Sequence, residues 1–187
     1  SILVGVLSWR QQLSARREEQ KRKVNLEIDL KEPMNSPSLE RTSGNLIFSN
    51  RGSKTLKSTV SLYVYPVTED INESLDPLFD EKKKEKFKEG HLQDYKITIR
   101  ASESRITSYN PRRIRDKVNL HNATSLWFYF QATYHPINQK KLEKTTEEIF
   151  KLFYQKGSDE WKVIKIGIKI LNRDKPDLSK VIEADRD

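Results

Sequence analysis

The three histidines are the first residues that could do acid–base or metal chemistry. His91, His121 and His135 stand in separate turn-like contexts, and none belongs to a metal-ligand spacing such as HExxH. The chain has no cysteine, which excludes disulfides, thiolate metal sites and cysteine nucleophiles. Its six glycines form neither a GxSxG nucleophile elbow nor a glycine-rich phosphate loop. We therefore expect no enzyme activity, no catalytic residues, no metal and no cofactor.

Adjacent carboxylates are the second candidates for chemistry. Glu147 precedes Glu148, and Asp159 precedes Glu160. Neighbouring residues of a strand point to opposite faces, so the first pair could not share a proton if its segment is extended. The second pair lies in a predicted turn. Because exposed carboxylates are the norm, we expect all four to be solvated.

Two basic clusters could bind nucleic acid. Lysines between residues 82 and 88 form the first, but glutamates interleave with them. The second follows Tyr109 and consists of Arg112, Arg113, Arg115 and Lys117. Cations beside an aromatic ring can hold phosphate and stack a base. No RNP, zinc-finger or helix-turn-helix signature accompanies this patch, so nucleic-acid binding is kept as an alternative to a patch for a protein partner.

The N-terminal segment combines an apolar stripe with dense positive charge. Residues 1–23 carry six basic and two acidic residues, which is half of the net charge of +8. Ile2, Val6, Trp9 and Leu13 recur at helical spacing, so a helix is predicted. The uncharged run ends at Trp9, whereas a bilayer span needs about 20 apolar residues. The segment is too short to cross a membrane alone.

This segment could instead be the end of a truncated transmembrane span. A tryptophan at the boundary followed by basic residues is typical of a span that leaves the bilayer on the cytoplasmic side. Juxtamembrane cations attract anionic lipid at about 1 kcal/mol each. The alternative is an amphipathic helix that packs on the body or on another copy of the chain. The predicted membrane-proximal residues are Trp9, Arg10, Arg16, Arg17, Lys21, Arg22 and Lys23.

The body of the chain changes to an alternation of every second residue, which predicts strands. Alternating runs occur at 24–30, 46–48, 60–65, 95–99, 126–131 and 164–170, and a hairpin is predicted around 155–160. The isoleucines 164, 166, 168 and 170 are expected on one face of their strand. About eight strands separated by turns favour an antiparallel β-sandwich.

Two strands carry large side chains on both faces. Val60, Leu62 and Val64 should face the core, with the serine and tyrosines between them on the opposite face. Trp127 and Tyr129 should share that second face with Tyr63 and Tyr65. We expect these aromatic residues to form either a partner surface or a core beneath an inserted helix.

The predicted helical insertion lies near residues 77–89. Asp76 can cap it, Pro77 suits its first position and Gly90 suits its end. The KTTEEIF segment, residues 144–150, could also be helical. Residues 172–187 are predicted to be a polar C-terminal tail.

The body resembles a known architecture. The Asn50–Gly52 turn that leads into TLKSTVSLYVYP, with the closing FYFQATY and IFKLFYQKGSDEWKV segments, resembles immunoglobulin-like β-sandwich domains of single-span bacterial membrane proteins. The resemblance covers residues 24–171. The chain departs from it by lacking a cysteine pair and by carrying the helical insertion. It implies an interaction or scaffold role and assigns no site residues.

The sequence thus predicts a membrane-proximal basic helix (1–23), a mainly β, antiparallel immunoglobulin-like β-sandwich (24–171) and a tail (172–187). The predicted function is a non-enzymatic interaction or scaffold module that binds a partner protein or assembly near a membrane, with its body in the cytoplasm. A nucleic-acid-binding domain is one alternative. An α+β cystatin-like or NTF2-like component of a membrane-associated secretion or transfer machine is the other.

Overall fold

The computed structural model describes residues 24–31, 44–67, 90–117, 123–155, 160–172 and 180–182, with the helical residues 11, 12, 15, 16, 85, 88 and 89. Predictions for Trp9, Arg10, Arg17, Lys21, Arg22, Lys23 and His121 lie outside these residues, as does most of the predicted insertion at 77–89. Within the described residues, no helix has the length and apolar character that a membrane crossing requires.

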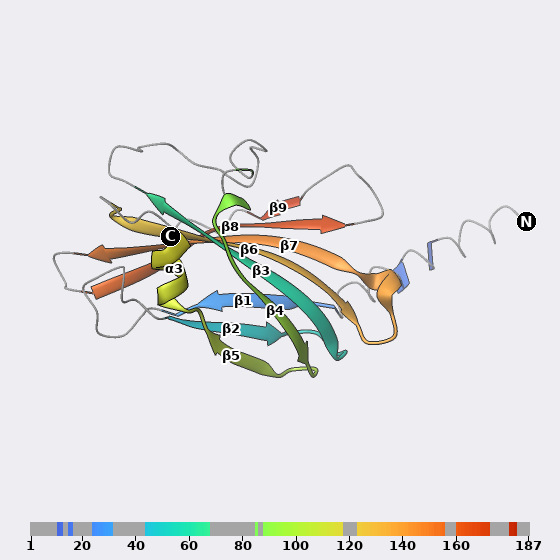
Figure 1. The fold of residues 1–187 in the computed structure, drawn as a ribbon. Helices are drawn as coiled ribbons and strands as arrows, with labels where there is room; N and C mark the ends of the chain where they lie inside the picture. Colours follow the sequence, from blue (N-terminus) through green and yellow to red (C-terminus); the bar gives the residue numbers. More distant parts are fainter. Residues whose placement is uncertain are drawn as a thin grey trace, which may run out of the picture.

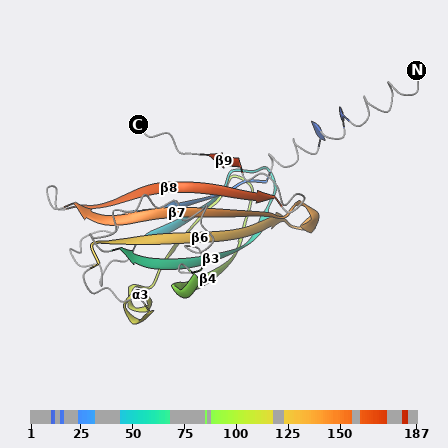
Figure 2. The same cartoon turned by 90° about the horizontal axis from the view of Figure 1, so that it is seen from above.

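The described residues form two antiparallel sheets that pack face to face (Figure 1). The small sheet has the order β1-β2-β5, with β1 at Leu26–Leu30, β2 at Asn45–Asn50 and β5 at Ser104–Ser108. The large sheet has the order β4-β3-β6-β7-β8-β9. Its strands are β3 Leu56–Val67, β4 His91–Ile99, β6 Ser125–Pro136, β7 Lys144–Gln155, β8 Glu160–Asn172 and β9 Lys180–Ile182. Figure 2 shows the strands of the large sheet side by side.

The strand order is that of an immunoglobulin-like sandwich. The first, second and fifth strands form one sheet, as strands A, B and E of an immunoglobulin domain do. The third, sixth and seventh strands are neighbours in the other sheet, as are strands C, F and G. The fourth strand joins β3 in the large sheet, and β8 and β9 extend that sheet beyond β7. The predicted fold class is therefore confirmed, and the α+β cystatin-like or NTF2-like alternative is wrong.

Alternation of side chains builds the core between the sheets. Even-numbered residues of β3 and β6 point inward, including Val60, Leu62 and Phe130, which are fully buried. Leu26, Ile28, Leu46 and Phe48 reach the same core from the small sheet. Because each such side chain stabilises the fold by roughly 1.5–3 kcal/mol on burial, this alternation fixes the pairing of the two sheets. The predicted inward face of residues 60–64 is confirmed.

The opposite face of the large sheet carries a second apolar cluster. Trp127, Tyr129 and Ile149 are buried there together with Val67, and Tyr63 packs partly buried against them. The rings of Tyr63 and Tyr129 have centroids 5.4 Å apart. Of the two roles expected for these aromatic residues, core is the one that fits Trp127 and Tyr129, which are only 6% and 2% exposed. Tyr63 and Tyr65 are partly buried against them.

A β-bulge divides the isoleucine run of β8. Ile149 pairs with Gly167, but Phe150 pairs with Lys165, so Ile166 is an extra residue on β8. Ile164 is 51% exposed, and Ile166 packs against the outer cluster of the large sheet. Ile168 takes a register position opposite the inward-facing Glu148. The expectation of one continuous isoleucine face is therefore wrong, because a bulge shifts the alternation by one residue.

Helical structure is sparse in the described part of the chain. The helix α3 spans Pro111–Lys117, and a 3-10 turn spans Lys140–Leu142. Residues 144–150 belong to β7, so their helical alternative is wrong. Glu85, Lys88 and Glu89 are helical, and Gly90 forms the turn that precedes β4. The predicted tail region contains β9, which pairs with β8.

Candidate functional site

On one side of the sandwich, two lysines of the large sheet contact backbone carbonyls in or next to β1 of the small sheet. The Lys144 ammonium donates a 2.7 Å hydrogen bond to the carbonyl of Val24, next to β1. The Lys165 ammonium, from β8, lies 3.5 Å from the carbonyl oxygen of Ile28 in β1. Both lysines cross from the large sheet to the small one. This side is therefore bridged by charged groups along β1.

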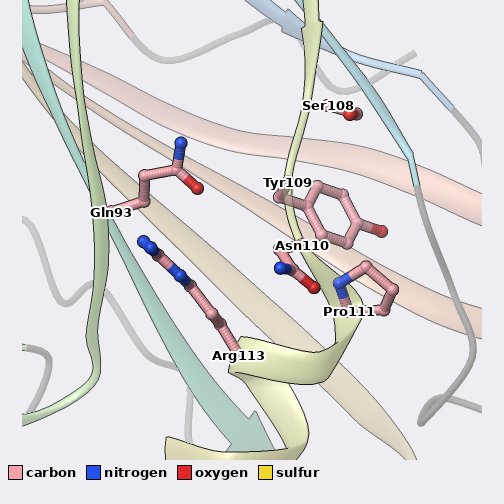
Figure 3. A pocket seen from close by; sticks show the side chains of 6 residues that line it. All are labelled: Gln93, Ser108, Tyr109, Asn110, Pro111 and Arg113. Atoms are coloured by element: carbon pink, nitrogen blue, oxygen red, sulfur yellow. The ribbon is translucent and has the colours of Figure 1, made fainter.

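The other side is bounded by the strands β4 and β5 and by α3, and we call it the β4–β5 side. An open hollow of about 470 Å³ lies there. Figure 3 shows Gln93 of β4 and Arg113 of α3 extending toward one another across it. The remaining lining residues follow one another along the chain from β5 into α3 and are Ser108, Tyr109, Asn110 and Pro111. The lining is mostly polar, so it suits a hydrogen-bonding ligand better than an apolar one.

The helix α3 begins at a signal that is visible in the sequence. The Asn110 side-chain oxygen accepts a 2.9 Å hydrogen bond from the backbone N–H of Arg112, and Pro111 occupies the first helical position. Ile114 is the buried apolar residue that holds the helix against the body. Asn110 and Pro111 form the same cap signal as Asp76 and Pro77, and it could have been used to predict this helix.

The residues of the predicted basic patch do not share one environment in the structure. Arg112 and Arg113 are exposed on α3, while Arg115 and Lys117 belong to that helix without described side chains. Tyr109 is 1% exposed and packs on Phe128, with ring centroids 5.0 Å apart. Its ring therefore serves as core and presents no face on which a base could stack. The exposed side chains of Arg112 and Arg113 can reach an anionic group in solution.

Gly44 permits the close packing of Tyr109. A Cβ atom at position 44 would lie 2.9 Å from Tyr109 Cε1 and 3.0 Å from the backbone oxygen of Lys31. Neither the buried ring nor the backbone can move away at low cost. Gly44 thus sets the position of the residue that leads from β5 into α3.

We expect Gly44→Ala to lower the free energy of unfolding by about 1 to 3 kcal/mol, because the added methyl group overpacks this contact. Urea unfolding followed by tryptophan fluorescence measures the change. Asn45→Ala, at an exposed neighbouring position, is the matched control and should leave the unfolding midpoint in place. Equal midpoints for the two variants would contradict the proposed packing role.

Asn50 ties the two sheets together next to β5. Its side-chain amide donates to the carbonyl oxygens of Lys54, Ile99 and Arg100 at 2.8, 3.1 and 3.0 Å. Its side-chain oxygen accepts a 2.9 Å hydrogen bond from the N–H of Gly52. Asn50 thus fixes both the predicted 50–52 turn and the turn that leads from β4 to β5.

Tyr95 lies on the inward face of β4 at the rim of this side. Its ring packs on Phe48, with centroids 5.5 Å apart. Burial raises the pKa of the Tyr95 hydroxyl to about 12, and the charge of Arg113 opposes that shift. The phenol therefore stays protonated at neutral pH.

Two carboxylates that were expected to be solvated are buried. Glu147 and Glu148 are each 2% exposed, and the expectation for this pair is wrong. They do point to opposite faces, as predicted for a strand: Phe130, which lies in the core, pairs with Glu148, and Gln131 pairs with Glu147. The bulge in β8 places Lys165 beside Glu148.

The Glu148–Lys165 ion pair lies between the sheets. The Lys165 ammonium is 2.8 Å from Glu148 Oε2 and lies 5.2 Å from the centre of the Phe150 ring. Desolvation raises the pKa of the Glu148 carboxyl, while the charge and hydrogen bond of Lys165 lower it. No motif signals this pair, because its partners meet only through the register of β7 and β8.

The histidines within the described residues hold ordinary structural positions. His91 Nε2 is 3.0 Å from Asp94 Oδ1, and the pKa of Asp94 is lowered mainly by this hydrogen bond. His135 Nδ1 lies 2.9 Å from the carbonyl oxygen of Pro136. Across the described part of the chain, no three histidine, aspartate or glutamate residues come close enough to hold a metal ion. Arg16, from the predicted membrane-proximal set, is helical and exposed.

Comparison with known proteins adds little to this description. No family model matches the chain, and no curated protein does. The chain is similar to the ASH/PapD-like domain 7 of human CEP192, at 15% identity and a TM-score of 0.36, over 66% of this chain and 80% of that one. It is also similar to a β-D-glucoside glucohydrolase from Trichoderma reesei, at 13% identity and a TM-score of 0.30. The latter match covers 86% of this chain but 19% of the enzyme, and TM-scores this low carry no information about function.

Proposed function

We propose that this chain is a non-enzymatic interaction module that binds a partner protein through the β4–β5 side. The observation that carries the proposal is the hollow between β4, β5 and α3, which is open and polar and is lined by the exposed cation Arg113. Arg112, the preceding residue of α3, is exposed as well. The opposite side is bridged by Lys144 and Lys165, and the outer face of the large sheet holds buried aromatic residues. The open, polar hollow and its exposed cation therefore support the β4–β5 side as the place where a partner binds.

Site-specific photocrosslinking in cells that naturally contain the protein tests this proposal. A photoreactive residue replaces Arg112 on the β4–β5 side, and in a control chain it replaces Ile164, which is exposed on the large sheet. We expect a discrete protein adduct from position 112 that an excess of the unlabelled chain competes away. Adducts of equal yield from position 164, or turnover of a small molecule by the purified chain, would contradict the proposal.

We also propose that the module works near a membrane, with its body in the cytoplasm. The basic residues between positions 10 and 23 support this proposal, because cations that follow an apolar segment are attracted to anionic lipid. The resemblance to domains of single-span bacterial membrane proteins points in the same direction and remains a prediction.

The membrane proposal predicts a loss of lipid binding when the charges are removed. Replacing Arg10, Arg16, Arg17, Lys21, Arg22 and Lys23 by glutamine should weaken binding to vesicles rich in phosphatidylserine more than a hundredfold, at about 1 kcal/mol per cation. Vesicle co-sedimentation measures the effect, with pure phosphatidylcholine vesicles as the control. Unchanged binding of the variant to anionic vesicles would reject the membrane-proximal role and leave the β4–β5 proposal standing.

A further inference from the structure

The strand β5 is the outermost strand of the small sheet (Figure 1). It pairs with β2 along one edge, and among the described residues no strand pairs with its other edge. A strand edge of this kind presents a row of backbone donors and acceptors to which an extended segment can add.

The register identifies which backbone groups face that edge. The N–H of Asn50 donates a 2.9 Å hydrogen bond to the carbonyl of Glu103, which continues the pairing of Ser49 with Ser104 by one residue. In an antiparallel pair, residues that exchange hydrogen bonds with the partner alternate with residues that do not. The backbone groups of Arg105 and Thr107 therefore face β2, as does the carbonyl of Glu103, while the Glu103 N–H donates to the carbonyl of Arg100. Ser104, Ile106 and Ser108 direct their backbone groups to the free edge.

Ile106 supplies an apolar contact beside those backbone groups. It is 69% exposed and pairs with the partly buried Ile47 on the outer face of the small sheet. A β-branched residue of an added strand would extend this row of isoleucines, since cross-strand apolar pairs stabilise a sheet. The neighbouring serines are small and leave room for such a residue.

The positive charge around β5 favours an acidic partner segment. Residues 103–117 contain five basic and two acidic residues, and Arg105, Arg112 and Arg113 are exposed. A second copy of the chain paired along this edge would bring two such basic segments together, which is unfavourable. An acidic segment meets complementary charge instead.

We propose that β5 receives an extended acidic segment of the partner protein as an added strand. The segment forms backbone hydrogen bonds with Ser104, Ile106 and Ser108, places an apolar residue beside Ile106 and directs its carboxylates toward Arg105 and Arg113. This inference rests on the proposed function and deepens it by naming the class of segment that binds.

An NMR titration of the full chain tests this inference. The probe is a terminally blocked octapeptide in which valine and glutamate alternate, and the control peptide has lysine in place of glutamate. We expect amide shifts centred on Ser104, Ile106 and Ser108, and an affinity at least tenfold higher for the glutamate peptide. Absence of binding, equal affinity of both peptides or shifts centred on β4 would overturn the proposal. Shifts at β5 that depend on protein concentration without peptide would also overturn it, in favour of self-association.

Two substitutions separate backbone pairing from a general loss of structure. Ile106→Pro removes the N–H that faces the free edge, a change that edge strands tolerate, and should weaken peptide binding at least tenfold. Ile106→Glu keeps the backbone intact, repels the acidic peptide and should weaken binding to the same extent. Ile164→Glu, at the exposed isoleucine of β8, is the matched control and should bind as the unaltered chain does. Unchanged binding by both Ile106 variants would reject the added strand.

The peptide and crosslinking results distinguish the two levels of the proposal. If position 112 crosslinks to a partner while the peptide fails to bind, the interaction role stands and the added strand is rejected. If position 112 gives no adduct, the proposed function fails whatever the peptide does.

Discussion

Lys165→Met lowers the free energy of unfolding by about 3 to 5 kcal/mol at pH 7, because it leaves the Glu148 carboxylate buried without its partner. The Lys165 ammonium is 2.8 Å from Glu148 Oε2, and the side chains are 27% and 3% exposed. Methionine keeps the length and apolar stem of lysine, so the packing against Phe150 is retained. Urea unfolding at pH 7 measures the loss.

The pH dependence of this variant has a definite sign. Burial raises the pKa of folded Glu148 above its ordinary value of 4.5. A carboxyl with a raised pKa contributes stability that is fully present below its unfolded pKa and is lost as the pH rises through its folded pKa. Removing Lys165 raises the folded pKa further, so the variant should regain stability as the pH falls from 7 toward 4.5. An equal loss of unfolding free energy at pH 7 and pH 4.5 would contradict the explanation that the variant is destabilised by the buried Glu148 charge.

Two further variants isolate the charge effect. Adding Glu148→Gln to Lys165→Met removes the buried charge and should restore most of the lost stability. Lys162→Met is the matched control, since Lys162 lies on the same strand and forms a 2.8 Å ion pair with the exposed Glu160. Exposed pairs contribute little, so this control should unfold at the unaltered midpoint. A double variant as unstable as Lys165→Met would indicate lost packing instead.

The second large effect is expected from Asn50→Asp, which should lower the free energy of unfolding by about 3 kcal/mol or more at pH 7. The aspartate has the same shape but replaces an amide donor by a carboxylate, which would face three carbonyl oxygens at 2.8 to 3.1 Å. Each lost donor leaves buried acceptors unsatisfied, and the new charge is buried with them. Thermal and urea unfolding measure the change.

Asn45→Asp provides the control for this substitution. Asn45 begins the same strand and is exposed, so the same chemical change there should cost little. Asn50→Asp should also broaden the NMR signals of residues 100–104, because Asn50 holds the turn before β5. Wild-type stability of Asn50→Asp would show that the three hydrogen bonds are not formed in solution.

The sandwich was predictable from sequence because most strands show an uninterrupted alternation of inward-facing apolar residues and outward-facing residues. In residues 60–64 of β3 and 126–130 of β6, every second residue is large and apolar, so the inward face is evident from Val60 and Phe128. The same rule fails in β8, where the bulge at Ile166 shifts the alternation and turns Lys165 toward Glu148. A bulge is set by pairing with the neighbouring strand. Gly167, next to Ile166, is a local signal for it, because a glycine inside a strand often marks a bulge, but it does not say which residues change face.

The candidate site was predictable only in part. Arg112 and Arg113 of the predicted basic patch are exposed, and their binding role stays a prediction, whereas Tyr109 was expected to be accessible and is buried. Its burial depends on Gly44, which is distant in sequence and close in space. The hollow and the free edge of β5 arise from the order of strands in two sheets, which periodicity alone does not determine.

The most direct test of the binding side is hydrogen–deuterium exchange of the full chain with and without the partner captured at position 112. The account predicts slower exchange of backbone amides in 91–99 and 103–117 when the partner is bound, with Ser104, Ile106 and Ser108 showing the strongest protection. Protection confined to β8 and β9, with exchange in 91–117 unchanged, would contradict it.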